Sequence, residues 1–264
     1  MLLGLILAVI VGITLGLVGS GGTILTVPIL VYAMGVNPVI ATTYSLFAIG
    51  ATAVVGGIKG FYKNEVDLQK VITFGLPSLL MVFIVRNYML SLVPEVFVFG
   101  SWEIHREVVL MILFALVMIA SSYSMISGTG ISFVRTSKRN SESVRQVVAQ
   151  GLFVGFVTGV VGAGGGFLII PTLVSVFSLP MKKAVSTSLV IIAINSAFGL
   201  LGDLEKFPEF DWYLLLSYTF FTIGGIFIGF FLSNKMDGEQ LKKSFGYLIL
   251  IVGIFVLLKE LWLG

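Results

Sequence analysis

Two short clusters of small residues have the composition of an anion-binding site. The first is Gly19-Ser20-Gly21-Gly22, followed by Thr23, and the second is Gly162-Ala163-Gly164-Gly165-Gly166. Each glycine disfavours a continuous helix by about 1 kcal/mol relative to alanine, so a helix should stop and restart at each cluster. The first N–H groups of a restarted helix lack partners and carry roughly half a positive charge. The clusters therefore predict backbone sites for a small anion, with Ser20 and Thr23 adding hydroxyl donors in the first copy.

Both clusters belong to an internal duplication. Residues 12–46 match residues 155–189 without a gap, and thirteen of the 35 pairs are identical, Pro28/Pro171 among them. Two homologous apolar halves, each interrupted by glycine and proline at matching places, are typical of secondary transporters. We expect two hairpins whose tips lie inside the membrane, with the two restarted helices converging near the midplane.

Hydroxyl and amide side chains supply further candidates for lining the path. Thr43 and Ser45 open the third segment of the first half, and Ser186 and Ser188 occupy the matching places of the second. Such hydroxyls either face substrate or bond the carbonyl four residues earlier. Asn195 either bonds a neighbouring helix or faces substrate. The predicted substrate-binding set is Gly19, Ser20, Gly21, Gly22, Thr23, Thr43, Ser45, Gly162, Gly164, Gly165, Gly166, Ser186, Ser188 and Asn195.

Other features favour a structural role. Glycine or alanine recurs every fourth residue at 4–16 and at 151–159, a pattern that favours close packing of helices. Tight helix crossing is also the alternative explanation of the glycine clusters themselves. Asp67 and Asp211 precede matching segments and are expected to cap them. Arg86 is expected to extend to the membrane interface, with a role in attracting anions as the alternative.

The elements that must position these residues are membrane helices. Hydrophobic residues make up 57% of the 264, charged residues 11%, and the mean hydropathy is +1.08, which indicates a multi-pass, all-α membrane protein. Domain boundaries are expected at 1–128 (first repeat), 129–145 (linker) and 146–264 (second repeat). The ten predicted segments lie near 3–19, 22–35, 39–58, 68–92, 107–128, 146–162, 164–179, 184–201, 212–232 and 240–262.

Charge predicts the orientation. An odd number of segments in each half inverts the second half relative to the first. If the linker is cytoplasmic, twelve of the 16 basic residues fall on its side and four on the other, as the positive-inside rule requires. Both termini are then outside. The net charge of +3 is accounted for by this bias, so no nucleic-acid partner is expected.

Enzyme motifs are missing from the sequence. Cysteine is absent and His105 is the single histidine, so no metal site or cofactor is expected. Neither glycine cluster fits a dinucleotide-binding fingerprint or the phosphate-binding loop that ends in lysine, and no G-x-S-x-G elbow occurs.

The twin blocks GLVGSGGTILTVPIL and GVVGAGGGFLIIPTL resemble the TauE/SafE family of sulfite-exporter-like membrane proteins over nearly the whole chain. The resemblance implies transport, with export as the expected direction, of sulfite, an organosulfonate or a related anion across a prokaryotic cytoplasmic membrane. It places the site at the two glycine clusters. Ala163 stands where the first copy has Ser20, so the two half-sites differ chemically.

Three readings of function stay open. Alternating-access transport of a small anion, with or without a coupled ion, is the first. An anion channel built from the same helix termini is the second. A non-transporting receptor or assembly subunit is the third. Besides the anion and the lipid bilayer, a second copy of the chain is a candidate partner, because the small-residue faces could also serve a homodimer.

Overall fold

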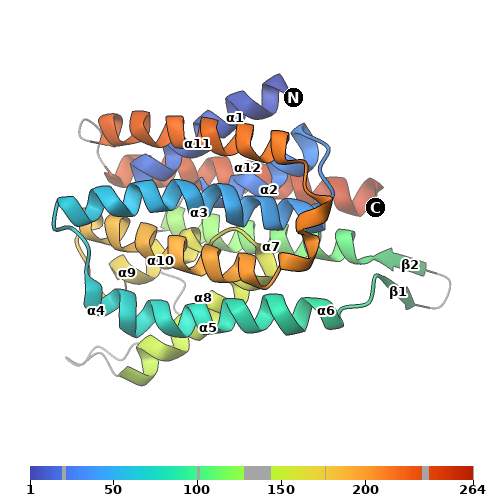
Figure 1. Ribbon diagram of the computed structural model, residues 1–264, viewed down its shortest axis with the longest axis horizontal. Helices are drawn as coiled ribbons and strands as arrows, with labels where there is room; N and C mark the ends of the chain where they lie inside the picture. The colour runs from blue at the N-terminus through green and yellow to red at the C-terminus, as the bar shows by residue number, and fades with distance from the viewer. Residues whose placement is uncertain (20–21, 100–101, 128–143, 176, 234–237, 264) are drawn as a thin grey trace.

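The protein is a bundle of long helices that run in nearly the same direction or its reverse, as Figure 1 shows. The structure is a computed structural model that describes the chain except residues 20–21, 100–101, 128–143, 176, 234–237 and 264. Helices of the first half are α1 (Leu2–Val18), α2 (Thr23–Pro28), α3 (Pro38–Tyr62), α4 (Leu68–Lys70), α5 (Leu76–Ile84), α6 (Leu90–Leu92) and α7 (Arg106–Ser127). Those of the second half are α8 (Val144–Val161), α9 (Gly166–Ser175), α10 (Met181–Leu201), α11 (Trp212–Ser233) and α12 (Gly238–Leu263).

The ten predicted segments correspond to these helices. Three π-helical turns complete them: Ile29–Ala33 extends α2, and Val71–Gly75 and Val85–Met89 join α4, α5 and α6 into one rod. The first of these turns follows Pro28, which has no N–H for the normal helical bond. As predicted, Asp67 and Asp211 cap helices: their Oδ1 atoms accept from the amides of Lys70 (3.1 Å) and Leu214 (3.0 Å).

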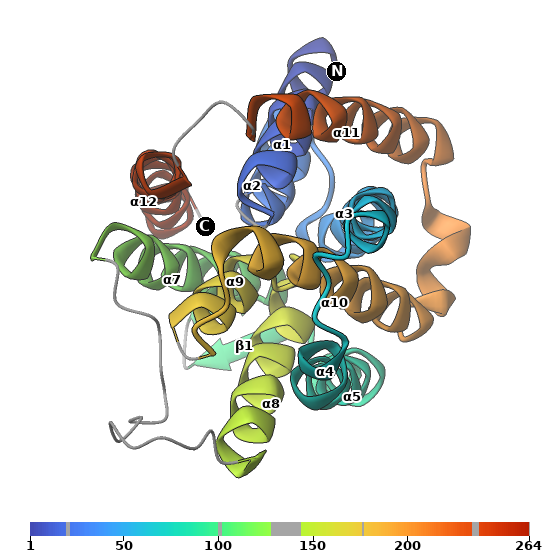
Figure 2. The same cartoon turned by 90° about the vertical axis from the view of Figure 1, so that its left-hand side faces the viewer.

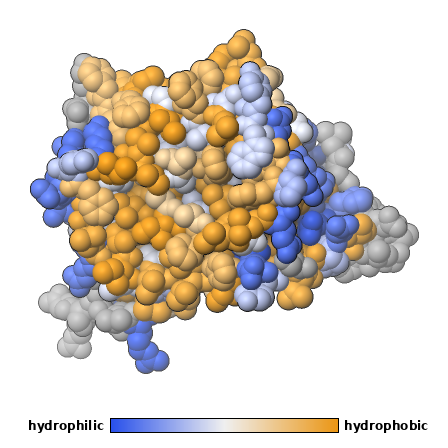
Figure 3. All heavy atoms as spheres, viewed as in Figure 1, coloured by the Kyte–Doolittle hydropathy of each residue, from blue (hydrophilic) through white to orange (hydrophobic). Residues whose placement is uncertain are grey.

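The outer surface of the bundle is suited to lipid. Six helical stretches within the described residues are long and apolar enough to cross a bilayer: Pro38–Tyr62, Leu68–Met89, Arg106–Ser127, Met181–Leu201, Trp212–Ser233 and Lys243–Trp262. On the face that Figure 3 shows, apolar residues cover the middle of the molecule and hydrophilic residues gather toward its two ends. The chain is therefore a multi-pass integral membrane protein.

The first helix of each half packs on the fourth helix of the other. Gly12 and Gly16 of α1 lie against Gly225 and Gly229 of α11, and a Cβ on any of them would overlap backbone of the facing helix. The equivalent contact brings α8 against α5. The predicted packing role of these regularly spaced glycines is confirmed.

The third helices of the two halves form the centre of the bundle. Along their contact, Gly50 of α3 faces Ser196 of α10, and Gly60 faces Ser186, so the two helices run antiparallel. The fifth helices, α7 and α12, are also antiparallel, because Gly246 lies near Ile126 and Gly253 near Met118. Figure 2, which looks along the bundle, shows α3 and α10 side by side, with α11 above and α4 and α5 below them.

A two-stranded hairpin lies between α6 and α7, outside the ten segments that the sequence predicts. β1 (Val96–Phe99) pairs antiparallel with β2 (Trp102–His105). The hairpin projects from the end of the bundle at which both chain termini lie (Figure 1). The end that carries Lys59–Leu68 and the start of α10 is the opposite one, called here the linker end; the end with the hairpin is called the hairpin end.

Candidate functional site

The second glycine cluster breaks the helix as predicted. α8 ends at Val161, and Gly162 closes it with a φ of +70° and an amide that donates to the Thr158 carbonyl (2.8 Å). Two residues later, Gly164 (φ +63°) faces Ile49 and Ile192 in the middle of α3 and α10. The chain therefore reverses inside the bundle, where irregular backbone is tolerated because protein surrounds it.

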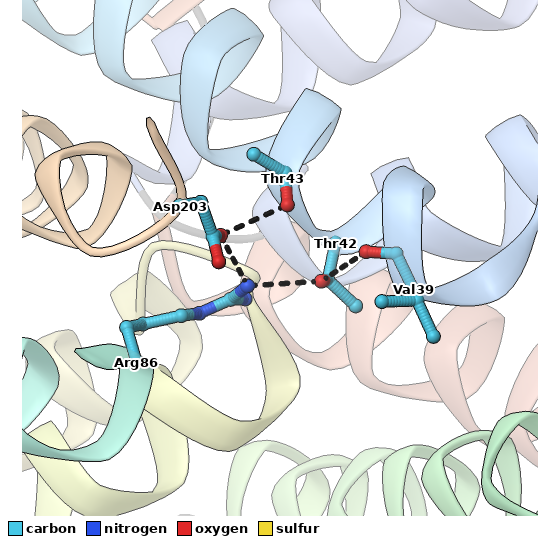
Figure 4. A network of polar contacts seen from close by, with 5 residues as sticks. All are labelled: Val39, Thr42, Thr43, Arg86 and Asp203. Atoms are coloured by element: carbon cyan, nitrogen blue, oxygen red, sulfur yellow. Dashed lines mark hydrogen bonds and ion pairs between the residues drawn. The ribbon is translucent and has the colours of Figure 1, made fainter. Parts of the chain in front are cut away.

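A buried ion pair lies at this break. Arg86, on the π-helical turn Val85–Met89, is 2% exposed, and its Nη1 donates to Asp203 Oδ2 at 2.7 Å. The same Nη1 donates to Thr42 Oγ1 (3.1 Å), and Thr43 Oγ1 donates to Asp203 Oδ2 (2.9 Å), as Figure 4 shows. Nη2 of Arg86 lies so close to Gly162 that an added Cβ there would overlap it.

The expectation that Arg86 extends to the interface is therefore wrong. Asp203, which lies just after the end of α10, is 1% exposed and neutralises the guanidinium inside the protein. A buried charge is tolerated when it is paired and hydrogen-bonded, and this pair meets both conditions on Nη1.

Several other polar atoms near the break have no partner. They include Nε and Nη2 of Arg86, the hydroxyl of Ser45 one turn along α3 from Thr42, and the hydroxyl of Ser196 beside Gly164. Asn195 donates from Nδ2 to Ser78 Oγ on α5 (2.8 Å), while its Oδ1 has no partner. Buried polar atoms without partners are few in folded proteins, so each of these atoms calls for an explanation besides packing.

A pocket opens at the linker end, between the same central helices. It has a volume of about 210 Å³, and its lining includes Lys59, Lys63, Glu65, Lys182 and Ser186. The Lys59 ammonium lies 3.7 Å from the centre of the Phe230 ring, and Ser186 Oγ donates to Glu65 Oε2 (3.1 Å). A volume of this size holds several waters, so the pocket has room for a small hydrated anion among three ammonium groups.

The two ends of the α3–α10 pair differ because the duplicated positions carry different side chains. When the duplication is extended at the same offset beyond residues 46 and 189, Gly60 pairs with Asp203, and the matching helix contacts make Ser233 the counterpart of Arg86. Both Gly60 and Ser233 line the linker-end pocket. Small residues thus leave a pocket at one end, where an arginine and an aspartate fill the equivalent space at the other.

The predicted site residues fall into separate groups. Thr43 and Gly162 join the Arg86 network, Gly164 lies at mid-depth, and Ser186 lines the pocket. Ser188 donates to the Gly19 carbonyl (3.3 Å), which ties the first break to α10. Thr23 is fully buried, Gly166 is the first residue of α9, and Ser20 and Gly21 lie outside the described residues.

Two of the predicted glycines have close packing neighbours. A Cβ on Gly22 would overlap the Val11 carbonyl, and one on Gly165 would overlap the Thr158 hydroxyl. The contact at Gly22 favours the packing explanation at that position, whereas Gly162, Gly164 and Gly165 each face a polar group without a partner. α2 and α9 touch each other, but the convergence of their N-termini stays a prediction, since residues 20–21 are not described.

Comparison with known proteins decides the family. Residues 4–256 match the family described as "Sulfite exporter TauE/SafE". The chain belongs to this family. The TauE/SafE relatives are named in general terms: a "Probable membrane transporter protein" of Xylella fastidiosa (strain 9a5c) is 28% identical over 94% of this chain and 91% of its own.

Two further relatives carry similar names. "Probable membrane transporter protein YunE" of Bacillus subtilis (strain 168) is 23% identical over 94% of both chains. "Probable membrane transporter protein MJ0441" of Methanocaldococcus jannaschii is 31% identical over 40% of this chain and 43% of its own. No solved structure matches the chain. The protein is thus a member of a membrane transporter family.

In this TauE/SafE protein, the pairing of Arg86 with Asp203 is not evident from the sequence. The two residues lie 117 positions apart, in different halves, and each has an ordinary explanation when it is considered alone. The available signal was the absence of a charge at the duplicated positions, Ser233 and Gly60. A charge present in one copy of a repeat and missing from the other marks a place where the two halves have different tasks.

Proposed function

We propose that the protein is a secondary transporter that carries a small sulfur oxyanion, such as sulfite or an organosulfonate, by alternating access. The observation that carries this proposal is a series of polar groups, separated by apolar contacts, along α3 and α10, called here the track. It begins at the lysine-lined pocket of the linker end and continues past Gly164 and Ser196 to the buried Arg86 at the hairpin end. Ammonium, guanidinium and hydroxyl groups are the donors that an oxyanion requires.

We further infer that the two halves are inverted repeats. The antiparallel packing of α3 on α10 and of α7 on α12 is what a two-fold axis perpendicular to the helices produces. The crossed pairing of α1 with α11 and of α8 with α5 fits the same axis. Inverted repeats give a transporter two conformations of similar energy, in which each half in turn plays the role of the other.

Transport by a carrier is favoured over an anion channel. The Arg86–Asp203 pair, with Thr42 and Thr43, fills the hairpin end of the track while the linker end holds a pocket. A site accessible from one end and closed at the other is the arrangement that alternating access requires. Membership of a transporter family favours both of these readings over a receptor or an assembly subunit.

The test is anion flux into proteoliposomes that contain this protein alone. Sulfite, sulfate, thiosulfate, taurine, sulfoacetate and chloride are compared, each with and without a pH gradient. We expect saturable uptake of a sulfur anion and accelerated exchange when the same anion is preloaded. Flux that rises linearly with concentration would indicate a channel. Folded protein that moves none of these sulfur anions would refute the proposal.

A further inference from the structure

We propose that the Nε–Nη2 edge of Arg86 is an oxyanion-binding subsite, which is used when the bundle opens at the hairpin end. The proposal rests on the anion transport proposed above, and it identifies the residue that contacts the anion there. Arg86 is 2% exposed, and its Nε and Nη2 have no partner, whereas its Nη1 has two. The guanidinium is therefore used on one side and free on the other.

The free side has the geometry that an oxyanion fits. Nε–H and one N–H of Nη2 point the same way along one edge of the planar group, and this edge binds two oxygens of a carboxylate, phosphate or similar anion through parallel bonds. Asp203 and Thr42 both accept from Nη1 and so leave that edge intact. Sulfite and sulfonates carry such oxygen pairs, and chloride does not.

The surroundings of the free edge allow it to be uncovered. Nη2 faces Gly162, which has no side chain and whose left-handed backbone (φ +70°) makes the chain turn away at this point. Ser45, one turn further along α3, adds a buried hydroxyl without a partner. A shift of the Gly162 turn away from Arg86 would uncover Nη2, which Gly162 now faces.

Asp203 is then a positioning residue. It keeps the guanidinium neutralised while no anion is bound, since a buried charge without a partner is costly. The bond from Thr43 Oγ1 (2.9 Å) and the bond from Nη1 (2.7 Å) fix the carboxylate on the far side of the group from the free edge. The arginine is in this way held in the orientation in which its free edge faces Gly162.

The first experiment compares Arg86→Lys with Arg106→Lys in the proteoliposome assay. Both variants keep their positive charge, and Arg106 begins α7 near the same end of the bundle, outside the Arg86 network. For the sulfur anion that the wild type carries, we expect KM to rise at least about tenfold in Arg86→Lys, because lysine cannot form paired bonds. Arg106→Lys should keep the wild-type KM. An unchanged KM in Arg86→Lys would overturn the proposal and leave the transport function in place.

The second experiment uses protein with Arg86 intact, so it gives an answer even if Arg86→Lys fails to fold. The chain has five arginines, and ¹⁵N-arginine labelling makes their Nε–H signals visible by NMR in detergent micelles. Lysine at the other four assigns the Arg86 signal. We expect this signal to shift saturably when the transported anion is added at constant ionic strength, and not with chloride. A signal that stays fixed at concentrations that saturate transport would overturn the subsite, whereas missing wild-type flux would refute the transport function instead.

Discussion

Arg86 and Asp203 carry opposite charges that are buried away from water. The free-energy cost of burying either charge stays small only while its partner is present. Each is at most 2% exposed, and they meet at 2.7 Å between two halves of the chain. Removing one partner of a buried ion pair typically costs about 3–5 kcal/mol, since the other charge stays buried alone, while replacing both by apolar residues costs far less. Substitutions in this pair should therefore change the stability of the protein as well as its transport activity.

We predict that Asp203→Asn lowers the thermal stability of the protein in detergent. The loss should correspond to about 3–5 kcal/mol, since Arg86 would be left without a counter-charge. Glu205→Gln is the control, because Glu205 is exposed in the turn that follows, and its change should stay within about 0.5 kcal/mol. The double variant Arg86→Met/Asp203→Leu should recover most of the stability and show no anion flux. Equal melting temperatures for Asp203→Asn and wild type would contradict this account.

The role of the linker-end pocket in anion binding can be tested by comparing substitutions at two neighbouring lysines. Lys182 and Lys183 are both exposed, but Lys182 lines the pocket and Lys183 lies outside its lining. We predict that Lys182→Gln raises the KM for the transported anion about two- to fivefold at low salt, the scale of an exposed charge interaction. The effect should shrink at high salt because the charge is screened. Lys183→Gln should leave KM unchanged; equal effects of the two substitutions would remove the pocket from the anion's path.

At the scale of elements, close approach of helix backbones holds the bundle together. In lipid, apolar side chains gain nothing by leaving the membrane, so packing between helices depends on small residues that allow close contact. Gly12 and Gly16 on α1 and Gly225 and Gly229 on α11 form such a contact, with a Cβ excluded at each. The equivalent glycines of α8, Gly151, Gly155 and Gly159, pack on the rod of α5.

Two adjacent glycines of α11 provide a matched test. A Cβ on Gly225 would overlap the Val9 carbonyl of α1, while a Cβ on Gly224 would have nothing within 4 Å. We predict that Gly225→Ala destabilises the protein by about 1–3 kcal/mol through overpacking. Gly224→Ala should be neutral or stabilise it by up to about 1 kcal/mol, because alanine favours the helix. The melting temperatures of the two variants in detergent test this prediction. A lower melting temperature for Gly224→Ala than for Gly225→Ala would contradict the α1–α11 contact described here.

For the whole molecule, the asymmetry between its two ends is the main structural fact. Both termini and the β1–β2 hairpin lie at one end, and the lysine-lined pocket lies at the other (Figure 1). Among the described residues, Lys59, Lys63 and Lys182 line the pocket, and the positive-inside rule assigns an end rich in basic residues to the cytoplasm. Anions inside a cell would then meet the lysine-lined pocket first.

Orientation can be measured directly because the native chain has no cysteine. Tyr62→Cys places a thiol at the linker end, and Glu95→Cys places one at the hairpin end; both residues are exposed. We predict that a membrane-impermeant maleimide labels Glu95→Cys in intact cells and labels Tyr62→Cys only after permeabilisation. The opposite labelling pattern would invert the proposed orientation without altering the fold.

The sequence by itself determined the membrane class, the ten helical segments, the two glycine breaks and the packing role of the regularly spaced glycines. These features depend on composition, on local propensity and on a duplication that is visible along the chain. Tertiary structure alone decided which charges are buried: Arg86 and Asp203, far apart in sequence, become partners because the crossed packing of the two halves brings α10 against the α5 rod. It also decided that Gly60 and Ser233 border a pocket. A pocket depends on how helices that are distant in sequence pack together, which local sequence does not specify.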